Sequence, residues 1–198
     1  MKKFFILLLI VGVGWEFYNR SDEISLGPGV AVTEVPKQEK IDPFISYTND
    51  DYTITAIATF RIKAKVLSKE NYYIDRESDL SPVDLALGWG NMSDERILEN
   101  IEISQSGRFY RWQVDAFPIP RREIETHSAN MHLIPASDAV NGVIERVRKG
   151  DIIEISGSLV NVMSNSDGWH WESSRTRSDT GKGACELIWV ESAHIVSL

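Results

Sequence analysis

The clearest pattern in the chain is an alternation of apolar and polar residues from position 52 to position 66. Apolar side chains occupy every second position, and threonines, an arginine and lysines stand between them at every position except Ile57. A period of two is typical of a β-strand with one buried face. At about 3.3 Å per residue the strand would reach roughly 50 Å. We therefore expect it to bend or to be shared between two sheets.

Capping signals predict three short helices. Ser81-Pro82-Val83-Asp84 combines an N-cap residue, a proline at the first helical position and an acid in the first turn, so a helix is expected to begin there. Ser93-Asp94-Glu95 predicts the start of a second helix. Ser137-Asp138 predicts a third, because the apolar residues from Val140 to Val147 are spaced i, i+3, i+4 and i+7.

The remaining apolar segments predict further strands. They are residues 109–114, 123–134, 151–163, 169–177 and 186–196. In the segment 151–163 the apolar face changes parity at Gly157, which indicates a β-bulge. The element order predicts an α+β fold that is mainly β, with a curved antiparallel sheet or a small barrel and about three short helices.

The first twenty residues have the composition of an export signal. Lys2 and Lys3 precede an apolar run over residues 4–15, and residues 16–20 close it. The whole segment 4–18 is short for a transmembrane helix. Gly12-Val13-Gly14 is a poor cleavage site, so we expect residues 1–20 to be an uncleaved signal anchor, with a cleaved signal peptide as the alternative. The positive N-terminus would stay in the cytoplasm, and the Met-Lys-Lys start is typical of bacteria. The predicted location is a single pass in the inner membrane with a periplasmic domain, or the periplasm after cleavage.

Composition and charge restrict the partners. Residues 21–45 have the proline, glycine and mixed-charge content of a linker, and residues 46–198 are expected to form one globular domain. The chain has a net charge of −8, of which residues 1–20 contribute +2, leaving −10 on the rest. This charge argues against nucleic acid and anionic lipid as ligands. The expected partners are the inner membrane, through residues 4–18, and a protein or small molecule in the periplasm; no cofactor is expected.

A polar cluster and a single cysteine are the main candidates for chemistry. Ser128, Asn130 and His132 would share one face of a strand, with His127 on the other, and could line a polar pocket. The simpler interpretation is a buried histidine with a backbone partner. Cys185 is the only cysteine; it is either a buried thiol or a nucleophile served by His132 or His127. The two histidines are too far apart on a strand to bind one metal ion, so no metal is predicted.

A second group combines arginine and tryptophan. Arg175 and Arg177 would share a strand face with Trp169 and Trp171, as in a site for an anion, a sugar or a peptide; an exposed face covered by long side chains is the alternative. Asp179-Thr180-Gly181 matches the tripeptide of aspartic proteases, which need two copies. The chain has one, so a turn explains it better, and Asp179 is counted only among the binding candidates. Arg108 and Arg111 are further arginines of interest.

Several segments resemble known families. Residues 148–157 are similar to barrel domains of the oligonucleotide/oligosaccharide-binding type, which implies an OB-like barrel. Signal peptidases have a similar Gly-Asp strand, but their Ser-Met pair is Asn130-Met131 here. Four segments together resemble an uncharacterised family of bacterial exported, membrane-anchored proteins, from which no activity follows. These segments are residues 85–90, 105–112, 127–136 and 173–190.

Two functions are consistent with these features. The first is a membrane-tethered periplasmic domain that is not an enzyme and binds a ligand or a partner in an envelope-associated assembly. The alternative is a hydrolase or transpeptidase that uses Cys185 with His132 or His127. A cysteine that reacts faster than a free thiol at neutral pH would favour the enzyme.

Overall fold

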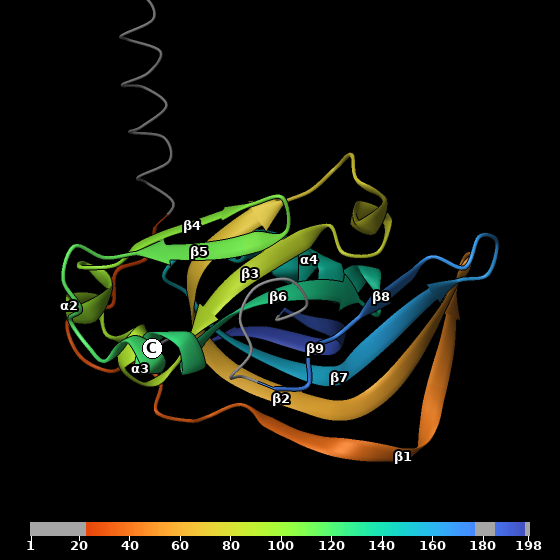
Figure 1. Cartoon of the computed structure of the whole chain (residues 1–198), viewed down its shortest axis with the longest axis horizontal. Coiled ribbons are helices and arrows are strands. Elements are labelled where there is room, and N and C mark those ends of the chain that lie inside the picture. Colours follow the sequence, from red (N-terminus) through yellow and green to blue (C-terminus); the bar gives the residue numbers. More distant parts are fainter. Residues whose placement is uncertain (1–22, 177–184, 197–198) are drawn as a thin grey trace, which may run out of the picture.

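Strand β2 (Tyr52–Asn71) is the longest element of the computed structural model, which describes residues 23–176 and 185–196. It pairs first with β1 (Lys37–Asn49) and then with β3 (Val83–Gly88), while β7 (Ile152–Ser164) runs along its other edge. The alternation thus predicts this strand correctly, and the sheet curves along it (Figure 1). Ile57 is an extra residue in the ladder with β7, which explains why both Ile57 and Ala58 are buried.

The strand pairings close into a ring. From β2 they run through β3, β6 (Ser128–Pro135), β9 (Glu186–Val196) and β7 back to β2, and β1 and β8 (His170–Glu172) extend the sheet. The expected mainly β fold with a curved sheet and three short helices is confirmed for the described residues. One detail of the expected antiparallel sheet is wrong, because β6 and β9 are parallel. The chain passes through a helix and two strands between them.

A short hairpin lies across the sheet as a separate element. Its strands are β4 (Glu102–Ser106) and β5 (Phe109–Gln113), and they pair only with each other. The hairpin lies over β3 (Figure 1). Ile103, Tyr110 and Trp112 of the hairpin are partly buried and pack, with α2 (Glu95–Leu98), against a small core on this face of the sheet. That core includes Ile124 of α3 (Arg121–Thr126).

Two capping signals and the glycine signal are confirmed. Asp94 caps α2 by accepting from the amide of Arg96, and Ser137 caps α4 (Asp138–Arg146). The register of β7 against β9 shifts between Ser156 and Gly157. A Cβ at Gly157 would lie 1.9 Å from the carbonyl oxygen of Trp189, so no other residue fits at this bulge.

One predicted element is wrong, and another is correct only in part. The helix expected at Ser81 is instead the strand β3, preceded by the 3₁₀ helix η1 (Arg76–Asp79) and followed by η2 (Gly90–Ser93). All residues of β3 are buried, and a strand buried on both faces shows no alternation to oppose the capping signal. The segment expected to be extended over 123–134 is a strand from Ser128 on, as β6, but it begins in the helix α3, where Ile124 turns into the core.

Residues 23–45, the described part of the segment expected to be a linker, contact the domain. Residues 37–45 belong to β1. The Glu95 carboxylate accepts hydrogen bonds from Ser25, Leu26 and Gly27. Most of β1 is exposed, which explains its linker-like composition.

Within the described ranges no helix has the length and hydropathy of a membrane span. The expected anchor, residues 1–20, lies outside these ranges.

Candidate functional site

Polar side chains gather on the face of β6 beneath the hairpin. Ser128, Asn130 and His132 occupy alternate positions of β6 and share this face. The Tyr110 hydroxyl donates to Ser128 Oγ at 3.1 Å, and Gln105 Nε2 donates to Asn130 Oδ1 at 2.6 Å. The hairpin therefore binds this polar row through side chains from both of its strands.

His132 is paired with an acid on the neighbouring strand. Asp84 stands directly opposite it in the β3–β6 ladder, so the two side chains project from the same face. Nδ1 of His132 lies 2.9 Å from Oδ2 of Asp84, and the side chains are 5% and 0% exposed. Neither atom has another polar partner in the described part of the chain. The carboxylate thus holds a proton on Nδ1 and leaves Nε2 for another partner.

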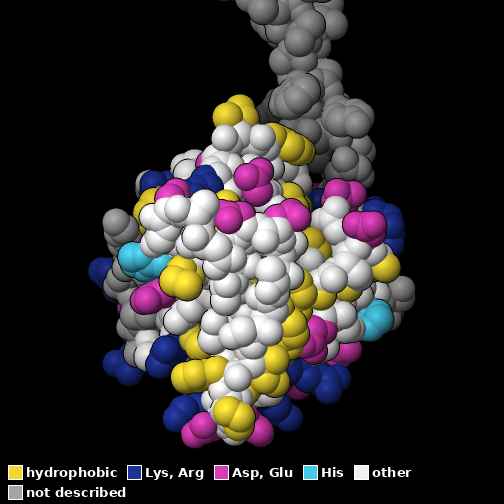
Figure 2. Space-filling model, turned by 90° about the vertical axis from the view of Figure 1, so that its right-hand side faces the viewer, with side chains coloured by type: hydrophobic (Ala, Val, Ile, Leu, Met, Phe, Trp, Pro, Cys, Tyr) yellow, Lys and Arg dark blue, Asp and Glu magenta, His cyan; other side chains and the backbone are white. Residues whose placement is uncertain are grey.

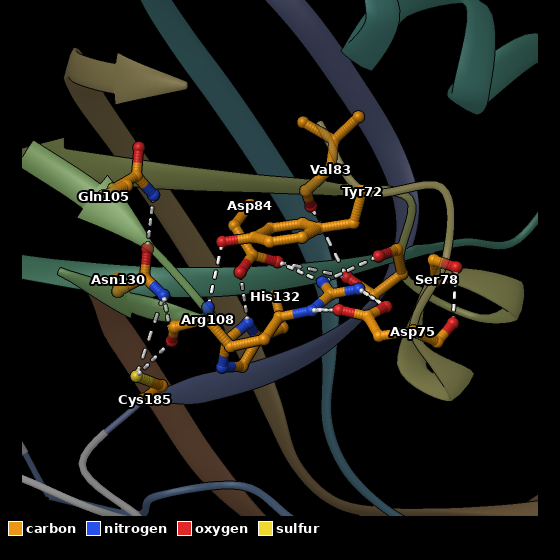
Figure 3. Close-up of polar contacts among 11 residues, drawn as sticks. Tyr72, Asp75, Ser78, Val83, Asp84, Gln105, Arg108, Asn130, His132 and Cys185 are labelled. Atoms are coloured by element: carbon orange, nitrogen blue, oxygen red, sulfur yellow. Dashed lines mark hydrogen bonds and ion pairs between the residues drawn. The ribbon is translucent and has the colours of Figure 1, made fainter. Parts of the chain in front are cut away.

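Cys185 completes this arrangement from the start of β9. Because β9 runs parallel to β6 and pairs Glu186 with Met131, Cys185 arrives beside Asn130. Its sulfur lies 3.7 Å from Asn130 Nδ2 and interacts with the His132 imidazole. Figure 3 shows the second ring nitrogen of His132 on the side that faces Cys185. The cysteine is half-buried, so the structure brings together the cysteine and one of the two histidines named from the sequence.

Arg108, at the tip of the hairpin, is the cation of the site. Its Nη1 lies 2.9 Å from Oδ1 of Asp84, and Nε and Nη2 bind both oxygens of Asp75 at 3.0 and 2.7 Å. The guanidinium carbon lies 3.7 Å from the ring centroid of Tyr72, a cation–π contact. The hydrogen bond from Arg108 lowers the pKa of Asp75, against a smaller effect of burial.

The charges of this cluster determine the state of His132. Burial alone would lower the pKa of the imidazole, but Asp84 and Cys185 outweigh it and raise the pKa to about 9. The carboxylates of Asp75 and Asp84 and the guanidinium of Arg108 together carry one net negative charge. A proton on His132 neutralises this charge. At neutral pH the ring is therefore an imidazolium.

Trp169 and Trp171 lie close to the site, but the arginine beside Trp169 is Arg76 and not the expected Arg175 or Arg177. The ring centroids of Trp171 and His132 are 4.8 Å apart, and Trp169 lies 6.2 Å from Trp171. The guanidinium carbon of Arg76 stands 4.7 Å from the Trp169 ring centroid. Arg175 is instead exposed in the loop after β8. Arg177 and Asp179 lie outside the described residues.

His127 has a different environment. It follows α3 and lies beside Trp89, with 6.3 Å between the ring centroids. Its Nδ1 is 3.2 Å from the carbonyl oxygen of Glu123. The simpler interpretation, a histidine with a backbone partner, therefore describes His127, while His132 has an acid as its partner.

Asp84, Asp75 and Gln105 were not predicted as site residues. Asp84 has one local signal, since it is an ionisable residue within the apolar run Val83–Gly88. Such a residue in a buried strand needs a partner. Asp75 and Gln105 lie in polar segments and have no comparable signal.

Among the residues that the structure describes, no three His, Cys, Asp or Glu side chains are grouped to hold a metal ion. Comparison of the chain with protein-family models, with curated proteins and with solved structures finds no match.

Proposed function

We propose that the protein is a cysteine-dependent hydrolase or acyltransferase in which Cys185 is the nucleophile, His132 the general base and acid, and Asp84 the group that orients His132. The observation that supports this is the sequence of contacts from Asp84 to His132 to Cys185. A nucleophile, a base and a third group that orients the base are the parts that covalent acyl transfer requires. The three residues come from three different strand regions of the fold.

The proposed reaction proceeds by transfer of an acyl group through sulfur. His132 Nε2 holds the proton lost by Cys185, and the thiolate attacks the acyl carbon of an ester, thioester or amide. The tetrahedral intermediate collapses as His132 gives that proton to the leaving group, which leaves the acyl group on Cys185. His132 then takes a proton from water, or from an acceptor amine or alcohol, which attacks the thioester and frees the sulfur.

Asn130 is the donor placed to stabilise the oxyanion. Its Nδ2 lies 3.7 Å from the sulfur, and a side-chain amide can serve as an oxyanion-hole donor. Gln105 fixes its orientation by donating to Oδ1, so the NH₂ group faces Cys185. The sulfur and a donor for the developing charge are thus side by side.

The proposed place of this reaction is the periplasm. The support is in the sequence: the basic start, the apolar run over residues 4–15 and the resemblance to exported, membrane-anchored proteins. With the chain anchored through residues 4–18, the substrate would be an acyl or peptide bond of the bacterial envelope.

A binding domain without catalysis is the second candidate, and two observations favour it. His132 is 5% exposed at its side chain, which also suits a structural ion pair. Figure 2 shows hydrophobic side chains gathered in a band on one face of the molecule, between groups of charged side chains. Such a surface, on an OB-like barrel, would suit a protein or small-molecule partner.

Trapping the covalent intermediate tests the proposal. The full chain is incubated with a panel of activated esters and thioesters and examined by intact mass. Because Cys185 is the only cysteine, an added acyl mass that is absent from Cys185→Ala identifies the nucleophile. We expect one acyl group per chain and its loss in His132→Ala, with His127→Ala as the matched control that still reacts. Acylation no faster in the native chain than in His132→Ala would favour the binding domain.

A further inference from the structure

The hairpin β4–β5 is attached to the sheet beneath it by side chains. It forms a two-stranded sheet of its own, and every residue of its strands is exposed or half-buried. The strands β3 and β6 below it are almost wholly buried. An element with few buried groups can open without unfolding the rest of a domain.

Arg108 holds the tip of this hairpin in place. It has φ +69°, next to Gly107 at φ +56°, and a non-glycine residue in this region is uncommon and requires compensation. The compensation is visible, since Nη1 binds both Asp84 and the carbonyl oxygen of Ser81, and the other two nitrogens bind Asp75. The backbone amide of Arg108 also donates to the Tyr72 hydroxyl at 3.0 Å.

The backbone of Arg108 also reaches the nucleophile. Its carbonyl oxygen accepts from Asn130 Nδ2 at 3.2 Å and from the Cys185 thiol at 3.9 Å. Figure 3 shows the Arg108 side chain running across His132 toward Asp75. With the hairpin docked, the side chain of Arg108 thus binds the Asp84 carboxylate. Its backbone carbonyl offers the Cys185 sulfur a hydrogen-bond acceptor that competes with His132.

We propose that the β4–β5 hairpin is a lid over Cys185 and His132, and that Arg108 is the latch that keeps it closed. In the closed state the Asp84 carboxylate is shared between Arg108 and His132. When Arg108 leaves, the carboxylate serves His132 alone and Arg108 no longer offers its carbonyl to the thiol. Opening the lid and activating the thiol are therefore one event. The inference rests on the proposed function for the identity of the site, but the lid is testable without a substrate.

The rate of alkylation of Cys185 by iodoacetamide, measured on the full chain by intact mass, reports lid opening. Arg108→Met removes the latch and keeps the apolar stem of the side chain. Arg111→Met is the matched control, because Arg111 is exposed on the same hairpin and its contacts, with Ser106 and with the ring of Phe109, stay within that hairpin. We expect Arg108→Met to react at least about tenfold faster than the native chain, since opening then limits access less, and Arg111→Met to react at the native rate. Arg108→Lys, which can bind one carboxylate, should fall between.

A folded Arg108→Met that reacts at the native rate or more slowly would overturn the latch. If that variant does not fold, hydrogen exchange of the native chain decides: a lid requires faster exchange in β4 and β5 than in β3 and β6, and equal protection would overturn it. The two proposals fail separately. An acyl-enzyme on Cys185 with no effect of Arg108→Met removes the lid alone. Faster alkylation of Arg108→Met with no acyl-enzyme in any form of the protein removes the enzyme and leaves the lid.

Discussion

Asp84 and His132 face each other across the β3–β6 ladder, and Oδ2 of the acid lies 2.9 Å from Nδ1 of the histidine. The register of two buried strands creates this contact, so neither side chain can move away without a change in the sheet. Asp84 also binds Arg108. One buried carboxylate thus links the base of the proposed reaction to the hairpin that covers it.

Replacing Asp84 should affect both stability and chemistry. Asp84→Asn leaves Arg108 and His132 without their shared carboxylate, and breaking a buried pair costs about 3–5 kcal/mol. We expect this loss in urea unfolding, together with loss of acylation at Cys185. The matched control is Asp167→Asn, because Asp167 pairs with Arg76 at an exposed position; its effect on unfolding should be much smaller. An Asp84→Asn chain as stable as the control would contradict the buried ion pair.

The stability of the domain should depend on pH through His132. The pKa of His132 is about 9 in the folded chain, above its ordinary value of 6.5, so between these values the folded state binds more protons than the unfolded state. The stabilisation is fully present below pH 6.5 and is lost as the pH rises through 9. At about 1.4 kcal/mol per pKa unit it amounts to roughly 3 kcal/mol.

Urea midpoints between pH 6.5 and pH 9 measure this dependence. In His132→Gln the difference between the two pH values should largely disappear, whereas His127→Gln should keep it. Stability that is constant or increases with pH over this range in the native chain would show that His132 is not protonated when folded.

Replacing Gln105 should reduce the rate of acylation of Cys185 but not the reactivity of its thiol toward iodoacetamide. Gln105→Leu removes the donor that orients Asn130, at a cost to stability of about 1–3 kcal/mol for the group left unpaired. We expect slower acylation of Cys185 without any slowing of its alkylation, because Gln105 is also one of the side chains that attach the hairpin to β6. Ser104→Leu, at an exposed position of the same strand, is the control. Parallel losses in both rates would mean that Gln105 acts only through the fold.

The helix α4 provides a test of the core. Val147 follows the helix and is 2% exposed within the main hydrophobic cluster. Val147→Asp would bury an unpaired charge and should unfold the domain. Val35→Asp introduces the same charge at a residue that is 61% exposed and should leave the thermal midpoint unchanged. A normal midpoint for Val147→Asp would place this residue outside the core.

The anchor is tested by mass and by fractionation. If residues 1–20 are retained, the protein stays in the membrane fraction at its full mass. Loss of about 14–20 residues from the intact mass would instead show a cleaved signal peptide.

Local signals predict the elements whose pattern lies within one segment. The alternation along β2, the cap at Ser137 and the parity change at Gly157 each follow from neighbouring residues, and the structure contains all three. The strand β3 was missed because its six residues are buried on both faces and a capping signal stands before it. A strand that is buried on both faces has no alternation of apolar and polar residues. The sequence therefore contains nothing to weigh against the helix-capping signal before it.

Only part of the candidate site can be predicted from the sequence, because some of its contacts leave no local pattern. The shared face of Ser128, Asn130 and His132 follows from the period of a strand, and Cys185 is evident as the only cysteine. The acid and the latch depend on long-range pairing: Asp84 meets His132 through the β3–β6 register, and Arg108 reaches Asp84 from a hairpin tip. Neither contact leaves a local pattern in the chain.

The pH dependence of Cys185 alkylation tests most directly whether His132 activates the thiol. The rates at pH 6 and pH 9 are compared in the native chain, in His132→Ala and in a free thiol. An imidazolium–thiolate pair should keep the two native rates within about threefold of each other, whereas the free thiol and His132→Ala should be about a hundredfold slower at the lower pH. A native chain that slows at pH 6 as much as the free thiol would contradict a nucleophilic Cys185.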